Sequence, residues 1–83
     1  MADPDHDRLG AALRRRRKLL GLSQQQLGDL AGCGRLFVLQ AEKGKATLRL
    51  DKLLALMRVL GLRFRIEPGQ GLVADAGDAR GRD

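Results

Sequence analysis

The sequence predicts a mostly α-helical domain in which four short helices precede one short strand. Leucine and alanine recur at helical spacing in four segments, and a glycine follows each segment. Tryptophan and tyrosine are absent and β-branched residues are few, which favours helices over strands. The 83 residues leave room for one small domain. A domain of this size buries only about 60% of its unfolded surface, so a partner chain would add stability.

Composition divides the chain into three regions. Residues 1–7 are acidic, contain a proline and lack periodic apolar residues, so we expect a flexible N-terminal arm. Residues 8–67 hold the periodic segments and form the predicted domain. Residues 68–83 are rich in glycine and aspartate, which cannot build a core, and are predicted to be a disordered tail.

The first two helices are marked by their ends. The first carries apolar residues from Leu9 to Leu20 and stops at Gly21. The second begins after Ser23, a good N-cap, and Gln26 stands three residues later, as in a capping box. We expect it to be about nine residues long and to end before Gly32.

The next two helices follow short connections. After a three-residue turn over residues 32–34, the third helix is predicted from Arg35 to Lys43, where Gly44 ends it. The fourth helix is terminated by Gly61 and carries an apolar stripe of Leu50, Leu53, Leu54, Met57 and Leu60. This stripe is predicted to serve the core and a dimer interface.

The hydrophobic period changes after the fourth helix. Leu62, Phe64 and Ile66 alternate with Arg63 and Arg65, a period of two that predicts a strand. Since no other segment reads as a strand, this one has no ladder partner within the chain. We therefore predict a homodimer in which the two strands pair across a two-fold axis.

The charge of the predicted domain points to a polyanionic partner. The whole chain carries a formal charge of +6, but residues 8–66 hold fourteen basic and three acidic residues, a formal +11. Such a segment favours nucleic acid ahead of a membrane surface as partner. The basic, amphipathic first helix could bind a membrane surface, but the two glycine-ended helices that follow do not fit a membrane-binding peptide.

The remaining composition excludes several classes of protein. The single cysteine, Cys33, excludes an internal disulfide and fits a reducing cytoplasm. No apolar run approaches the roughly 20 residues of a membrane span. The only histidine, His6, lies in the predicted arm and receives no function, and no nucleophile has a base at plausible spacing. We therefore predict no enzyme, no catalytic residue, no metal site and no cofactor.

Two short helices joined by a glycine-containing turn form a helix-turn-helix, whose second helix enters the DNA major groove. On the third predicted helix, Arg35, Leu36 and Gln40 are the predicted base contacts. Arginine pairs with guanine, glutamine pairs with adenine, and leucine can touch a thymine methyl group. The predicted phosphate contacts lie at the helix ends and are Ser23, Gln24, Lys43 and Lys45.

Some residues have a structural and a functional interpretation. Leu36 could cover an edge of the core, form a dimer contact or contact DNA, whereas packing is favoured for Phe37. Cys33 is predicted to be a small packed turn residue. Arg14, Arg15 and Lys18 belong to a basic run that is either a solvated helix face or a source of phosphate contacts.

The residues from Leu9 to Gly32, followed by Glu42-Lys-Gly-Lys45, resemble the Cro/repressor helix-turn-helix family, often called XRE. The run from Leu48 to Leu62 is similar to the HipB-like antitoxins of that family. The resemblance implies a lambda-repressor-like bundle whose short strand pairs between subunits. It also implies an ion pair between Arg17 and Glu42. The turn carries Cys33-Gly34 where the family usually has Val-Ser, so the third helix lacks a hydroxyl cap.

The resemblance further implies a dimeric repressor that binds a pseudo-palindromic operator in its own operon. It would also bind and restrain a HipA-like serine/threonine kinase toxin. The alternatives are a stand-alone phage-type repressor without a toxin partner, and a protein-binding antitoxin whose reading of DNA is weak or lost.

Overall fold

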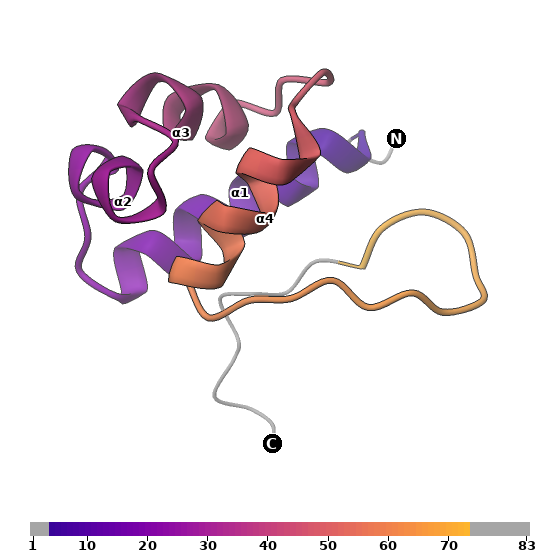
Figure 1. The fold of residues 1–83 in the computed structure, drawn as a ribbon. Coiled ribbons are helices and arrows are strands. Elements are labelled where there is room, and N and C mark those ends of the chain that lie inside the picture. The colour runs from indigo at the N-terminus through magenta and orange to yellow at the C-terminus, as the bar shows by residue number, and fades with distance from the viewer. Residues whose placement is uncertain (1–3, 74–83) are drawn as a thin grey trace.

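The protein is a bundle of four helices, seen in a computed structural model that describes residues 4–73. In chain order the helices are α1 (Asp5–Leu19), α2 (Gln24–Ala31), α3 (Arg35–Glu42) and α4 (Leu50–Val59), as Figure 1 shows. The four predicted helices are therefore present, and their C-terminal ends lie within one residue of the predicted ones.

The predicted arm over residues 1–7 is wrong in its second half, because α1 already begins at Asp5. Pro4 precedes the helix, and its carbonyl accepts hydrogen bonds from the backbone N–H groups of Asp7 and Arg8. The carboxylates of Asp5 and Asp7 lie in the first turn, where negative charge interacts favourably with the helix dipole. Residues 1–3 lie outside the described residues.

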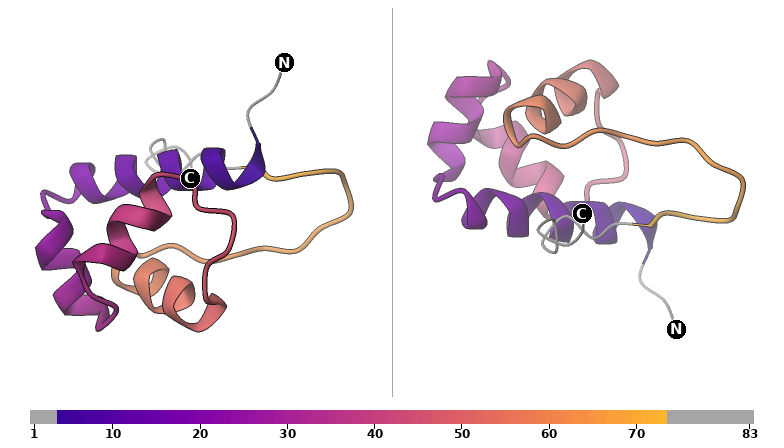
Figure 2. Two further views of the ribbon diagram at one scale, coloured as in Figure 1. Left: turned by 90° about the horizontal axis from the view of Figure 1, so that it is seen from above. Right: turned by 90° about the horizontal axis from the view of Figure 1, so that it is seen from below.

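The core lies where the four helices meet. α2 packs against α3 and α4, and α1 packs against α3 (Figure 2). Each helix contributes an apolar side chain that is almost fully buried, and so does the residue that follows α4: Leu13, Leu27, Val38, Leu56 and Leu60. Phe37, Ala41, Leu53 and Met57 complete the cluster.

Two glycines inside helices allow the close approach of neighbouring backbones. A Cβ atom on Gly28 of α2 would lie 2.5 Å from the carbonyl carbon of Gly34. A Cβ atom on Gly10 of α1 would lie 2.6 Å from the carbonyl oxygen of Ala41. Both distances are shorter than any real contact, so α1 and α2 reach α3 and its preceding turn only because these side chains are absent.

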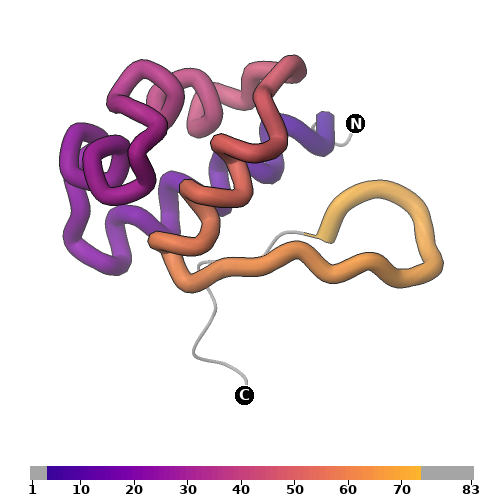
Figure 3. The backbone as a smooth tube through the Cα atoms, viewed as in Figure 1, coloured from indigo at the N-terminus to yellow at the C-terminus, as the bar shows by residue number. Residues whose placement is uncertain are grey.

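The strand predicted from Leu62 to Ile66 does not form in the single chain, and none of residues 4–73 is in a strand. A strand requires a ladder of hydrogen bonds with a neighbour, and the described part of one copy supplies none. Instead, the segment leaves α4 and runs out beyond the helices before it turns back toward the start of α1 (Figures 1 and 3). The guanidinium Nε of Arg16 donates to the carbonyl oxygen of Leu60 at 2.9 Å and so fixes the point of departure.

Of the predicted tail over residues 68–83, residues 68–73 have no regular secondary structure. The rest of that prediction, residues 74–83, lies outside the described residues. Between residues 4 and 73 there is no helix of the length and apolar character that crossing a membrane would need.

Candidate nucleic-acid interface

Local hydrogen bonds define both ends of α2 and the turn that leads to α3. The Ser23 hydroxyl accepts the backbone N–H of Gln26 at 3.0 Å, and the Gln26 side chain accepts the backbone N–H of Ser23 at 2.8 Å. At the other end Gly32 has a left-handed φ of 71°, and the carbonyl of Gly28 accepts two backbone N–H groups of the turn at 3.1 Å. α2 and α3 are thus held at a defined angle, although no side chain caps α3.

α3 separates a buried face from an exposed one. Phe37, Val38 and Ala41 face the core and are buried, so Phe37 packs as predicted. Leu36 stays 61% exposed and covers no edge of the core that residues 4–73 form. Arg35 is exposed at the first turn, and Gln40 is half-buried one turn after Leu36.

An ion pair ties α1 to the end of α3. The guanidinium of Arg17 donates to both carboxylate oxygens of Glu42, through Nε at 2.6 Å and through Nη2 at 3.0 Å. Its Nη1 donates to the carbonyl oxygen of Leu22 at 2.8 Å. The hydrogen bond to Glu42 raises the pKa of Arg17 above its ordinary value. Both side chains are buried, so the charges depend on each other.

The predicted phosphate contact Gln24 is part of the same network. Its amide Nε2 donates to Glu42 Oε1 at 3.2 Å, which leaves one N–H of the amide and the backbone N–H at the start of α2 for another partner. Ser23 beside it is exposed, and its hydroxyl proton is not used by the capping box.

The other predicted phosphate contacts, Lys43 and Lys45, are both exposed and flank Gly44 at the end of α3. Gly44 has a φ of 81°, which ends the helix and turns the chain. The two lysines therefore stand at the C-terminal end of the same helix whose first turn carries Arg35.

The structure divides the basic run of α1. Arg16 hydrogen-bonds to the carbonyl of Leu60 and Arg17 pairs with Glu42, whereas Arg14, Arg15 and Lys18 are exposed.

Cys33 is half-buried in the turn, and this burial raises the pKa of its thiol above the ordinary value. Within residues 4–73 no three His, Cys, Asp or Glu side chains gather as a metal site would require.

Three structural residues were not predicted from the sequence. Gly10 and Gly28 each interrupt a helical pattern, a signal that could have indicated close approach to another backbone. His6 donates from Nδ1 to the carbonyl oxygen of Gly44 at 2.7 Å. No sequence signal pointed to that contact, because the two residues belong to separate elements.

Comparisons with known proteins agree with this geometry. Residues 13–66 match the sequence profile of the family described as helix-turn-helix. An uncharacterized HTH-type transcriptional regulator, y4mF, of Sinorhizobium fredii is 36% identical over 63 residues, which are 75% of this chain and 83% of that protein.

A similar fold is found in the clp gene regulator ClgR of Corynebacterium glutamicum. The TM-score is 0.65 at 23% sequence identity, over 72% of this chain and 64% of that one. The chain therefore spans less than two thirds of that regulator's length, and the likeness concerns the fold. The sequence match and the arrangement of α2, the turn and α3 lead to one conclusion: this chain belongs to the XRE-type helix-turn-helix family of DNA-binding regulators.

Proposed function

We propose that this chain is a homodimeric repressor that reads a pseudo-palindromic operator upstream of its own gene. The observation that carries the proposal is the division of α3 into a buried apolar face and an exposed face at its first turns. Arg35 and Leu36 lie exposed in the first turn of α3, which is the part of the second helix that contacts base edges in a helix-turn-helix.

The exposed side chains of α3 suit the edges of bases in the major groove. Arg35 can donate two hydrogen bonds to guanine O6 and N7, and Gln40 can pair with adenine N6 and N7. Leu36, which is exposed next to Arg35, offers an apolar contact to a thymine methyl group. Each good bidentate pair discriminates between bases by about 1–3 kcal/mol.

The backbone of the DNA would be held at both ends of the helix-turn-helix. Ser23 and the backbone N–H of Gln24 lie at the N-terminus of α2, which favours a phosphate. Lys43 and Lys45 follow α3 and add two positive charges. These contacts would orient the protein, while α3 supplies the sequence reading.

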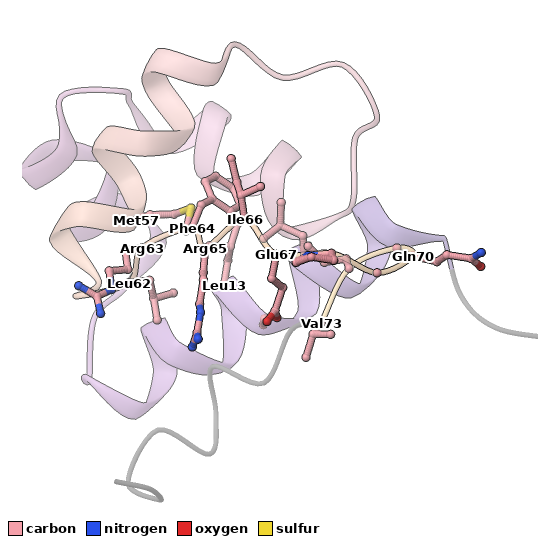
Figure 4. A pocket seen from close by; sticks show the side chains of 16 residues that line it. Leu13, Met57, Leu62, Arg63, Phe64, Arg65, Ile66, Glu67, Gln70 and Val73 are labelled. Atoms are coloured by element: carbon pink, nitrogen blue, oxygen red, sulfur yellow. The ribbon is translucent and has the colours of Figure 1, made fainter.

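The segment after α4 supports the dimer. Phe64 is 41% exposed and Ile66 is fully exposed, a costly arrangement for apolar residues in a monomer. The segment borders a cavity of about 600 Å³ that Leu13 of α1 and Met57 of α4 also line (Figure 4). Two copies whose 62–66 segments pair as antiparallel strands would satisfy the backbone groups and cover these side chains.

The experiment that tests this function is fluorescence anisotropy on DNA from upstream of the gene, against shuffled DNA, at physiological salt. Preference for the operator by a factor of about a thousand or more is expected of a specific regulator. Changing Arg35 and Gln40 to alanine should remove the preference. Equal weak binding to both DNAs, with or without these changes, would reject sequence-specific repression.

An antitoxin role is a second candidate. The observation that favours it is that α4 is followed, within the described residues, by a non-helical segment that could pair between subunits and not by a fifth helix. Purification of the tagged chain from its host should then capture a HipA-like serine/threonine kinase, identified by mass spectrometry. Capture of the operator DNA without a kinase would reject the antitoxin role and support a stand-alone repressor. Either role places the protein in the cytoplasm with its DNA.

A further inference from the structure

The first turn of α1 packs against the loop that follows α3. His6 Nδ1 lies 2.7 Å from the carbonyl oxygen of Gly44, so the imidazole donates to this carbonyl. Gly44 is buried, and a Cβ atom there would lie 3.0 Å from the Cα atom of Asp7 and closer still to the Asp7 carboxylate. The contact is therefore between backbones as well as side chains.

Gly44 is fixed from two sides. On the side of α3, its N–H donates to the carbonyl of Ala41 and the N–H of Lys45 donates to the carbonyl of Gln40, both at 3.1 Å. On the other side stands His6, 38 residues away in sequence. Without the imidazole, the Gly44 carbonyl would lose the hydrogen bond that it accepts within residues 4–73, and this side of the loop would keep only its packing against Asp7 of α1.

The loop carries both predicted phosphate-binding lysines. Lys43 and Lys45 are the immediate neighbours of Gly44, and both are exposed. A shift of the Gly44 peptide would displace both attachment points together. Lysine side chains are long and flexible, so their contribution to phosphate binding depends on where the backbone holds them.

We propose that His6 is a positioning residue for the phosphate contacts of Lys43 and Lys45, acting through its hydrogen bond to Gly44. This inference rests on the proposed function, since it needs a DNA-bound α3. Both the neutral Nδ1–H tautomer and the imidazolium can donate to the carbonyl. The first turn of α1 thereby becomes part of the DNA-binding surface without touching the bases.

Two substitutions distinguish this role from a general one. In His6→Asn the amide nitrogen takes the place of Nδ1, whereas in His6→Gln the amide lies one atom farther out, near the place of Nε2. Both variants keep a polar side chain in a half-exposed first turn. We expect His6→Asn to retain DNA affinity and His6→Gln and His6→Ala to lose it. Circular dichroism should show equal helix content in all three variants.

The salt dependence of binding is the decisive readout. Since phosphate contacts carry no sequence information, His6→Gln should weaken binding to operator and shuffled DNA by the same factor. The slope of log K against log salt should fall in magnitude by about 1 for each phosphate group that the variant no longer binds. In a Lys43→Ala/Lys45→Ala background, His6→Gln should have no further effect.

Several outcomes would overturn the proposal. Unchanged affinity and salt slope in His6→Gln, with normal operator binding by the wild type, would reject the role of His6 alone. A decrease in affinity in His6→Asn equal to that in His6→Gln would also reject it. A wild-type protein that binds no DNA would reject the proposed function and this inference together. A long-range nitrogen–proton NMR spectrum of the free protein should show a proton on His6 Nδ1, and its absence would count against the hydrogen bond.

Discussion

Arg17 of α1 and Glu42 of α3 are joined by two hydrogen bonds between buried side chains, the shorter of which spans 2.6 Å. Glu42 also accepts the amide of Gln24 at the start of α2. One carboxylate therefore connects three helices behind the proposed DNA-binding face. The orientation of α3 relative to the N-terminus of α2 depends on this connection.

Removing Glu42 should destabilise the fold strongly. In Glu42→Ala the guanidinium of Arg17 remains buried without a counter-charge, which typically costs about 3–5 kcal/mol in the free energy of unfolding. Urea denaturation of the purified variant measures this loss. A paired change of Arg17→Met and Glu42→Leu is the control, because it leaves no unpaired charge and should recover most of the stability. A loss below about 1 kcal/mol in Glu42→Ala would place the pair among ordinary surface ion pairs.

Arg35→Ala should weaken operator binding by about 1–3 kcal/mol and relax the preference at one base position. The Arg35 side chain is exposed and lies outside the buried core, so the melting temperature should change little. Binding to a panel of operators with single base changes measures both effects. An equal loss on all sequences would show that Arg35 contacts phosphate only.

Gly28→Ala should destabilise the protein even though alanine is the better helix former. The new Cβ atom would collide with backbone atoms of Gly34 and Arg35, at 2.5 Å and 2.7 Å. Overpacking of this kind costs about 1–3 kcal/mol, against a gain of about 0.5–1 kcal/mol from helix propensity. Thermal unfolding measures the balance, and the control is Asp29→Ala on the exposed side of α2, which removes only an exposed hydrogen bond from Gln25 and adds no clash. A higher melting temperature for Gly28→Ala would contradict the close approach of α2 to the turn.

Phe64→Glu should shift the protein toward a monomer. Phe64 lies on the apolar face of the segment that we propose pairs between two copies, whereas Arg65 lies on the alternate face. Light scattering coupled to size exclusion should give a dimer for the wild type and for Arg65→Gln, and a monomer for Phe64→Glu. A wild-type monomer at micromolar concentration would reject the paired strands.

Asp51→Asn should lower stability near neutral pH but not in acid. The Arg49 guanidinium, which donates at 2.7 Å and 3.1 Å, lowers the pKa of Asp51 below its ordinary value. A carboxylate with a lowered pKa in the folded state stabilises above its unfolded pKa of about 4 and loses this effect as pH falls through the folded pKa. The urea midpoints of wild type and variant should thus converge toward about pH 2, which lies about two units below the unfolded pKa. A constant difference across that range would show that the charge of Asp51 is not involved.

The sequence by itself determined the helices, their order and the family. Apolar periodicity and the glycines at positions 21, 32, 44 and 61 are local signals, because helix ends depend on residues within one turn. The capping box at Ser23 is local for the same reason. The candidate DNA-binding residues followed from their places on α2 and α3.

Tertiary structure decided the contacts between elements distant in the sequence. Gln24 turned toward Glu42, Arg16 toward the carbonyl of Leu60, and His6 toward Gly44. A polar side chain takes whichever partner the packed helices bring within about 3 Å, and no local pattern records that choice. The segment from Leu62 to Ile66 also depends on a partner that the local sequence does not specify. Its alternation defines the two faces of a strand, but residues 4–73 contain no hydrogen-bonding partner for it, and we propose that a second copy supplies one.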